Sequence, residues 1–300
     1  MSHTVTVGLD GSRESVAAAL WAAQEAQRRA LPLRLVHVWE WEPTTQAPLM
    51  GPGTQRHWAE RIPRETAYDL RIRFPELEIT TEQIVGQPAA VLPVAAEEAE
   101  LLVLGSRGLS GVAGFLVGSV AQATVATAER PVVLVRAGEI AEDEHRLDTD
   151  GLPSAATPYR DVVLGLDTSR PSEALIEFAF DAAARRGAVL RAIHGWSLPP
   201  VYGYNPGAMD PMLNEDLAAN EASTLTETLR AWREKFPGVE VIEQSTVGQA
   251  AQHLIEAASD ACLVVVGRRT RHSAIGTHVG PVTHAVLHHS PAPVAVVPHD

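Results

Sequence analysis

Leu101–Ser119 reads LLVLGSRGLSGVAGFLVGS, and this stretch decides the fold. Its first four residues form a short apolar run of the kind found in buried strands. Gly105 and Gly108 follow, and nine further residues lead to Gly118 and Ser119. Glycines let the backbone approach an oxyanion closely, and the first N–H groups of a helix point toward it. The stretch therefore predicts a strand, a glycine loop and a helix start that together hold phosphate.

Apolar runs and helical stretches alternate on both sides of this motif. The apolar runs do not alternate with polar residues, which is typical of parallel strands buried on both faces by helices. The expected strands are Val5–Leu9, Leu33–Trp39, Glu78–Val85, Leu101–Leu104 and Val132–Val135. The expected helices are Arg13–Ala30, one ending near Phe74, one from Pro88 to about Glu98, and one ending near Ala128. This order predicts an open α/β fold with a parallel sheet.

The second half of the chain repeats the first. Asp10 recurs as Asp167 with an offset of 157 residues, and Gly105 recurs as Gly267 with an offset of 162 residues. Constant offsets over several landmarks indicate one fold that has been duplicated. We predict a first domain at 1–137 and a second at 159–300. The acidic, apolar-poor segment 138–158 between them is interpreted as a solvated linker.

Composition narrows the class of protein. A length of 300 residues suits two domains of roughly 150 residues each. The net charge of −13 disfavours a nucleic-acid or anionic-membrane partner. Lys235 is the only lysine and lies far from the glycine motif, so a P-loop is excluded. The single cysteine, Cys262, is interpreted as a buried apolar residue. With no signal peptide or membrane-length apolar run, these features favour a cytoplasmic protein.

Three motifs together resemble the universal stress protein family in its tandem form. They are the strand end Gly8–Ser12, the turn Gly86–Pro88, and the glycine motif from Gly105 to Ser119. The resemblance covers almost the whole chain except the linker. It implies two tandem Rossmann-like (adenine nucleotide alpha hydrolase-like) domains, each a five-stranded parallel sheet of order 3-2-1-4-5 with helices on both faces. Ligands of such sheets bind at the carboxyl ends of the strands, here between the first and the fourth.

The resemblance also implies ATP as the ligand, and it allows a Mg²⁺ ion with the phosphates. It places the triphosphate at the glycine motif, the adenine or ribose near Asp10, and the adenine against the backbone of Val38. The positions that it assigns to the nucleotide are Leu9, Asp10, Ser12, Val38, Gly105, Arg107, Gly108, Gly118, Ser119 and Val120. For Asp10, Arg107 and the loop itself, the alternatives are a turn carboxylate, a solvated loop residue and a tight turn without a ligand.

The copy of the motif in the second half is degenerate. Thr270 stands where the first half has Gly108, and Pro281 stands where it has Ser119. The threonine adds a Cβ, and the proline removes an N–H donor and a hydroxyl. We expect a weaker second site, or none, around Asp167, Gly267 and Gly280.

Histidines raise a separate question. His284 and His288 are four residues apart and would share one helix face. The residue after His284 is alanine rather than the glutamate of a zinc protease, and no third ligand is placed by sequence. We interpret the pair as a polar helix face and expect no metal site. His37 and His194, which recur in the second strand of each half, are interpreted as buried structural imidazoles.

The function that we expect is that of an ATP-binding, nucleotide-responsive regulator in stress or growth arrest, which the resemblance implies. No pattern of paired carboxylates or of nucleophile and base indicates an efficient enzyme, although slow ATP hydrolysis stays open. One alternative is a low-activity adenine-nucleotide hydrolase or transferase. Another is an interaction protein without a ligand. Similar proteins pair through their fifth strands, so we expect the two domains to pair within the chain and the protein to form a homodimer, with a protein partner that the sequence does not identify.

Overall fold

The computed structural model describes residues 4–40, 52–106, 117–138, 141–198, 211–270 and 279–300. The chain divides into two compact units, which are considered separately. Unit 1 consists mainly of Met1–Ala141, and unit 2 consists of Glu142–Arg269 with Gly280–Asp300.

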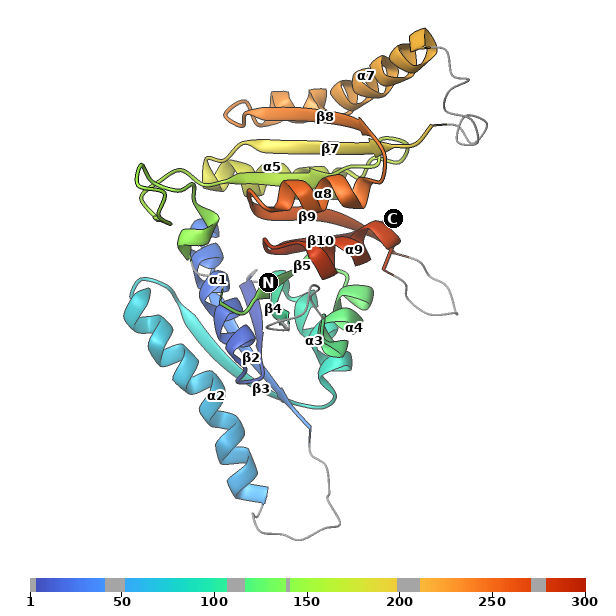
Figure 1. Cartoon of the computed structure of the whole chain (residues 1–300). Coiled ribbons are helices and arrows are strands. Elements are labelled where there is room, and N and C mark those ends of the chain that lie inside the picture. Colours follow the sequence, from blue (N-terminus) through green and yellow to red (C-terminus); the bar gives the residue numbers. More distant parts are fainter. Residues whose placement is uncertain (1–3, 41–51, 107–116, 139–140, 199–210, 271–278) are drawn as a thin grey trace. The chain divides into compact units, whose positions relative to one another are not determined.

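Unit 1 contains a five-stranded parallel sheet (Figure 1). Its elements are β1 (Thr4–Leu9), α1 (Arg13–Arg29), β2 (Leu33–Trp39), α2 (Pro52–Arg73), β3 (Ile79–Val85), α3 (Pro88–Glu97), β4 (Ala99–Ser106), α4 (Ser119–Thr127) and β5 (Val132–Arg136). The strand order is β3-β2-β1-β4-β5. Helices α1 and α2 pack together on one face, and α3 and α4 pack together on the other.

Unit 2 repeats this arrangement. Its elements are β6 (Asp161–Gly165), α5 (Glu173–Arg186), β7 (Leu190–Trp196), α7 (Pro211–Lys235), β8 (Val241–Val247), α8 (Ala250–Ala258), β9 (Ala261–Arg269), α9 (Pro281–His289) and β10 (Val294–His299). The strands are parallel in the order β8-β7-β6-β9-β10. The predicted fold class is therefore confirmed in both halves.

Strands β1 and β5 are buried along nearly their whole length. All five residues of β5 are buried, as are five of the six in β1, because helices cover both faces of each sheet. The outer strand β3 is instead largely exposed. Cys262 lies fully buried in β9, which confirms its interpretation as a core residue. Among the described helices, none has both the length and the apolar character needed to cross a membrane.

The strand order places the candidate site. β1 pairs with β2 on one side and with β4 on the other, so the order of the chain reverses between β1 and β4. The connections that leave these two strands run to opposite faces of the sheet, which opens a crevice at their carboxyl ends. β1 ends at Leu9 and β4 ends at Ser106, next to the glycine motif.

The segment before β6 is more ordered than expected. The segment 138–158 was predicted to be a solvated linker, and its residues 146–158 are indeed exposed or half-buried, but the segment also makes regular contacts. Glu144 and His145 are buried, and the rings of His145 and Tyr159 lie 3.9 Å apart. The Arg146 amide donates to Pro158 and the Arg160 amide donates to Glu144, both at 2.9 Å. Residues 142–160 thus form a small hairpin-like structure, which an acidic composition alone did not indicate.

Candidate functional site

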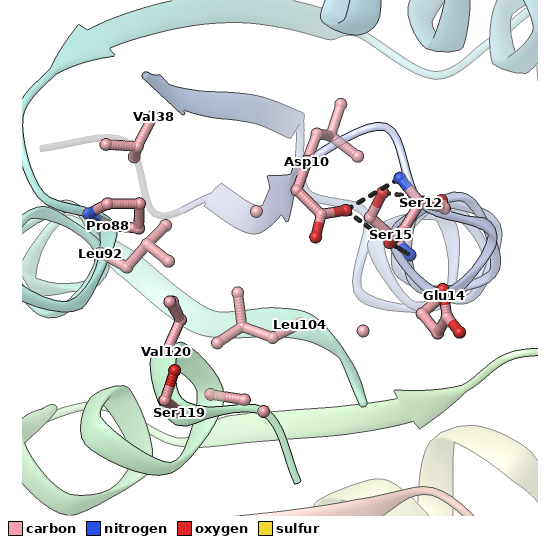
Figure 2. A pocket seen from close by; sticks show the side chains of 15 residues that line it. Asp10, Ser12, Glu14, Ser15, Val38, Pro88, Leu92, Leu104, Ser119 and Val120 are labelled. Atoms are coloured by element: carbon pink, nitrogen blue, oxygen red, sulfur yellow. Dashed lines mark hydrogen bonds between the residues drawn. The ribbon is translucent and has the colours of Figure 1, made fainter. Parts of the chain in front are cut away.

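A pocket of about 150 Å³ lies at the carboxyl edge of the sheet in unit 1. It is enclosed by the ends of β1, β2 and β4 and by the starts of α1, α3 and α4 (Figure 2). Its lining consists of Gly8, Leu9, Asp10, Ser12, Glu14, Ser15, Val38, Pro88, Leu92, Leu104, Gly105, Gly118, Ser119, Val120 and Ala121. These residues come from six elements, so only the folded chain brings them together.

Eight of the ten positions assigned to the first nucleotide site line this one pocket. They are Leu9, Asp10, Ser12, Val38, Gly105, Gly118, Ser119 and Val120. The other two, Arg107 and Gly108, lie outside the described residues. The structure thus brings the predicted residues together, and their contact with a nucleotide stays a prediction.

One wall of the pocket is the start of α4. Gly118 is the N-cap residue of this helix and has no side chain that could accept a hydrogen bond from the first turn. The amides of Ser119, Val120 and Ala121 therefore have no acceptor within the helix. These N–H groups and the positive end of the helix dipole favour an anion at this wall.

The wall on the other side of the opening is apolar. Val38 at the end of β2, Pro88 at the start of α3 and Leu92 one turn later lie together there (Figure 2). The sequence reasoning missed Pro88 and Leu92 as site residues. The signal was present, because Pro88 begins the helix after β3 and Leu92 lies one turn later on the same face. The pocket thus combines an apolar wall with a wall of backbone donors.

Asp10 supplies a charged group beside these walls. Its carboxylate accepts hydrogen bonds from the amide of Ser12 at 2.9 Å and from the Ser12 hydroxyl at 2.5 Å. Partial burial alone would raise the pKa of Asp10, but these hydrogen bonds from Ser12, with help from Ser15, hold the pKa below its usual value. Asp10 is therefore ionised at neutral pH. Glu14 is the other charged side chain on the described lining, which holds no basic side chain.

Ser12 also organises the start of α1. Its hydroxyl oxygen accepts the Ser15 amide at 3.2 Å, so Ser12 is the N-cap residue, as predicted. The first turn of α1 lies directly over Gly105 in β4. A Cβ on Gly105 would come within 2.5 Å of the Glu14 carbonyl carbon and within 2.7 Å of the Ser15 nitrogen. Only glycine fits here, because the atoms in the way belong to the backbone.

The two recurring histidines each form a hydrogen bond at the carboxyl end of the first strand of their unit. His37 Nδ1 lies 2.7 Å from the Leu9 carbonyl oxygen, and His194 Nδ1 lies 3.0 Å from that of Leu166. A carbonyl oxygen only accepts, so each ring nitrogen donates its N–H. His37 donates to Leu9, the last residue of β1, and His194 donates to Leu166, which directly follows β6. Both imidazoles are buried. Their interpretation as structural residues is confirmed.

The predicted second site has a different arrangement in unit 2. Asp167 accepts hydrogen bonds from the amide and hydroxyl of Ser169, and it lies 3.5 Å from Arg269. Burial alone would raise the pKa of Asp167, but the bonds from Ser169 and the charge of Arg269 lower it. Gly267 lies under the His299 side chain, whose Nε2 is 2.6 Å from where a Cβ would stand. Gly280 is the N-cap residue of α9, where Pro281 contributes no N–H.

Comparison with known proteins gives the family. The model of the Universal stress protein family matches residues 1–136 and 158–298. A universal stress protein of Mycobacterium tuberculosis is 34% identical over 302 residues, which cover 98% of this chain and 96% of that protein. One of Mycolicibacterium smegmatis is 32% identical over 307 residues, with 98% and 97% coverage. The crystal structure of a universal stress protein from Archaeoglobus fulgidus shares the fold, with a TM-score of 0.70 at 18% identity, covering 99% of this chain and 98% of that one. Because the family model matches both halves, the chain belongs to the universal stress protein family in its tandem, two-domain form.

Proposed function

We propose that this protein binds an adenine nucleotide, with ATP as its ligand, in the pocket of unit 1. The observation that carries the proposal is the division of that pocket into two walls. Val38, Pro88 and Leu92 offer an apolar surface that suits the flat adenine ring. The amides at the start of α4 offer donors to phosphate oxygens.

The carboxylate of Asp10 suits the ribose, which lies between the adenine and the phosphates of such a ligand. An ionised carboxylate can only accept hydrogen bonds, and the ribose hydroxyls are donors. The same charge would repel phosphate, so the phosphates should lie toward Gly118 and Ser119 instead. A Mg²⁺ ion that accompanies the phosphates would offset this repulsion, and Asp10 and Glu14 are the two carboxylates of the lining that could face it.

We propose binding and slow exchange rather than efficient turnover. Phosphoryl transfer relies on cations that neutralise charge developing on the phosphate oxygens. The single lysine, Lys235, is in α7 of unit 2, where its ammonium lies 2.6 Å from Glu177. The protein would then act as a cytoplasmic regulator whose partners respond to the bound nucleotide. Pairing of the two units through their fifth strands and formation of a homodimer belong to the same proposal.

We further propose that the two units are unequal, with tight binding in unit 1 and weak or no binding in unit 2. Three features of unit 2 support this. Arg269 lies against the aspartate that would face the ligand, Pro281 removes a donor from the helix start, and His299 covers Gly267.

Mass spectrometry of small molecules released from denatured, freshly purified protein tests the proposal. We expect an adenine nucleotide at about one per chain, and calorimetric titration of stripped protein with ATP should give the same stoichiometry. Two equal sites would contradict the asymmetry. A chain that carries no nucleotide and gains no thermal stability with ATP would contradict the function and favour a ligand-free interaction protein. Turnover near ~1 s⁻¹ in a single-turnover assay would favour the hydrolase instead.

A further inference from the structure

A cleft of about 770 Å³ lies in unit 2 at the amino ends of the strands. The starts of β6, β7 and β8, the turn before β9 and the segment 142–160 enclose it. The nucleotide motif of each unit instead follows the carboxyl end of a strand. The cleft is therefore separate from both predicted nucleotide sites, and the ordered segment 142–160 supplies one of its walls.

Three arginines line this cleft, and two of them are paired with one buried carboxylate. Asp161 accepts hydrogen bonds through one oxygen from Arg191, from Nε at 3.1 Å and from Nη2 at 2.5 Å. Its other oxygen lies 3.4 Å from Nη2 of Arg146. The carboxylate of Asp161 thus fixes two guanidinium groups and is itself fully neutralised by them.

The third arginine, Arg160, is held in place but not neutralised. Its Nε donates to the His145 carbonyl oxygen at 2.9 Å, and its backbone amide donates to the Glu144 carbonyl oxygen at the same distance. Within the described part of the chain, its two terminal nitrogens have no hydrogen-bond or ion-pair partner. A guanidinium that is fixed through Nε offers its remaining N–H groups as a planar fork, which matches a carboxylate.

A carboxylate without a partner stands next to Arg160. Asp260 directly precedes Ala261, which pairs with Asp161 in the parallel sheet. Arg160 and Asp260 therefore occupy neighbouring positions before β6 and β9, where adjacent strands are about 5 Å apart. Both side chains line the cleft, and among the described residues they form no ion pair with each other or with a third group. Such a pair matches a ligand that carries a carboxylate and an ammonium on one carbon atom.

The cleft also offers apolar surface. Leu147 from segment 142–160 and Ile242 of β8 both line it, and both side chains are exposed. Covering them with an apolar group of a ligand would remove this surface from water, which is favourable. The side chain of an apolar amino acid is such a group, attached to the same carbon as its carboxylate and ammonium.

The same edge of unit 1 has a different charge arrangement. Arg34 is the counterpart of Arg191, and its Nη atoms lie 2.5 Å from Glu82 and 3.1 Å from Glu98. Glu98 is the counterpart of Asp260 by the repeat. In unit 2 Arg191 instead bonds the buried aspartate at the start of β6, which leaves Asp260 without an arginine. The unpaired charges thus belong to unit 2 and not to the duplicated fold.

We propose that this cleft binds an apolar α-amino acid as its zwitterion. The ligand carboxylate lies on the terminal nitrogens of Arg160, the ammonium lies against Asp260, and the apolar side chain packs on Leu147 and Ile242. The bound amino acid joins segment 142–160 to the amino edge of the sheet. The site does not depend on the nucleotide, because it uses the opposite edge of the strands.

The test is equilibrium dialysis of the full chain with radiolabelled L-leucine, with L-phenylalanine and L-methionine as competitors. We expect one binding site per chain. Isocaproate has the same carbon skeleton without the ammonium, and isopentylamine lacks the carboxylate. Each loses one charge-assisted contact, so each should compete at least about tenfold less well than L-leucine.

Variants of the two charged residues locate the site. Arg160→Gln and Asp260→Asn should each weaken L-leucine binding at least about tenfold. Arg170→Gln removes an exposed arginine beyond the other end of β6. Glu240→Gln removes a carboxylate of the same cleft that precedes β8, two strands from β6. These two matched controls should bind L-leucine as the unchanged chain does, and circular dichroism shows that each variant is folded.

Three outcomes would overturn the proposal. The first is that none of the three amino acids binds. The second is that isocaproate competes as well as L-leucine, which would indicate a site for anions in general. The third is that Glu240→Gln or Arg170→Gln weakens binding as much as Asp260→Asn and Arg160→Gln do, which would contradict the assignment of the two charged contacts.

Discussion

Val38 in unit 1 and Gly195 in unit 2 stand at the same place, next to the end of the second strand, yet their neighbours differ. A Cβ on Gly195 would lie 2.6 Å from the Cα of Ala250, the first residue of α8. Without a side chain at Gly195, the strand and the helix start have closed on each other. Val38 carries a Cβ and more, so Pro88 at the start of α3 cannot approach as closely, and both residues line the pocket. One side chain thus separates the apolar pocket wall of unit 1 from the close contact between strand and helix in unit 2.

The first helices of the two units also begin differently. α1 begins at Arg13 after Ser12, whereas α5 begins at Glu173 after Ser172, three residues later in the repeat. Pro171 is the physical reason, because proline disfavours the helical conformation in the residue before it. The turn that covers Gly105 with backbone in unit 1 is therefore missing over Gly267.

These differences share a lesson about duplicated folds. The parallel sheet, its strand order and the histidine that bonds each first strand are the same in both units. What differs between the units lies at the carboxyl edge of each sheet, outside the core. Packing of the core thus requires the same frame in both units, whereas the residues at the carboxyl edge can differ without disturbing it.

The largest expected effect is on nucleotide binding through the two N-cap glycines. Gly118→Asp places a carboxylate that accepts the first N–H groups of α4 and repels phosphate, so ATP affinity should fall by at least about 100-fold. Gly280→Asp makes the same change at the start of α9 and should leave ATP affinity unaltered. Aspartate suits an N-cap, so both helices should remain folded. Tight ATP binding by Gly118→Asp in a calorimetric titration would contradict the assignment of the site to unit 1.

A second comparison concerns the glycine at the end of the fourth strand. Gly105→Ala forces a methyl group against backbone atoms of Glu14 and Ser15 and should lower the free energy of unfolding by about 2 kcal/mol. Gly267→Ala meets the far end of the His299 side chain at its closest contact, which can move, and should cost less than about 1 kcal/mol. Urea denaturation of the two variants measures the difference. Equal losses would show that the first turn of α1 does not set the requirement for glycine.

The later start of α5 predicts a smaller difference in stability, between alanine variants of Ser12 and Ser169. Ser12→Ala removes the N-cap of α1 and should cost about 1 kcal/mol of unfolding free energy. Ser169 is the counterpart of Ser12 by the repeat, but Ser172 caps α5, so Ser169→Ala should cost only a few tenths of a kcal/mol. Thermal or urea unfolding checks both. If Ser169→Ala proved the more costly variant, the difference in helix starts would be refuted.

The smallest expected effect is the acid dependence of stability from Asp10. Its pKa is lowered in the folded chain, so its ionised form contributes stability above the unfolded pKa of about 3.9, and that contribution is lost as the pH falls through the folded pKa. Asp10→Asn should therefore be less stable than the unchanged chain at pH 6, with the gap narrowing toward pH 3. Asp167→Asn should behave in the same way. A gap that stays constant over this range would argue against ionised carboxylates at either position.

Much of the local structure could be predicted from the sequence. The strand expected at Leu33–Trp39 matches β2 residue for residue, because a mainly apolar, β-branched and aromatic run after Pro32 has few alternatives. The N-cap role of Ser12 could likewise be predicted, since a serine side chain before an alanine-rich helix can accept a hydrogen bond from the amide three residues later. The glycine motif and its degenerate copy placed the pocket at the carboxyl ends of the strands in the first half of the chain.

The chain by itself determined the sheet, its duplication and the loss of donors in the second motif, because these depend on local pattern, spacing and the covalent nature of proline. The tertiary structure alone decided which residues face each other across the edge. The closure of Gly195 on Ala250, the contact of Arg269 with Asp167 and the apolar wall at Leu92 join residues far apart in sequence. Such contacts depend on how closely a helix approaches a strand, and a single missing Cβ changes that distance without changing the pattern that forms either element.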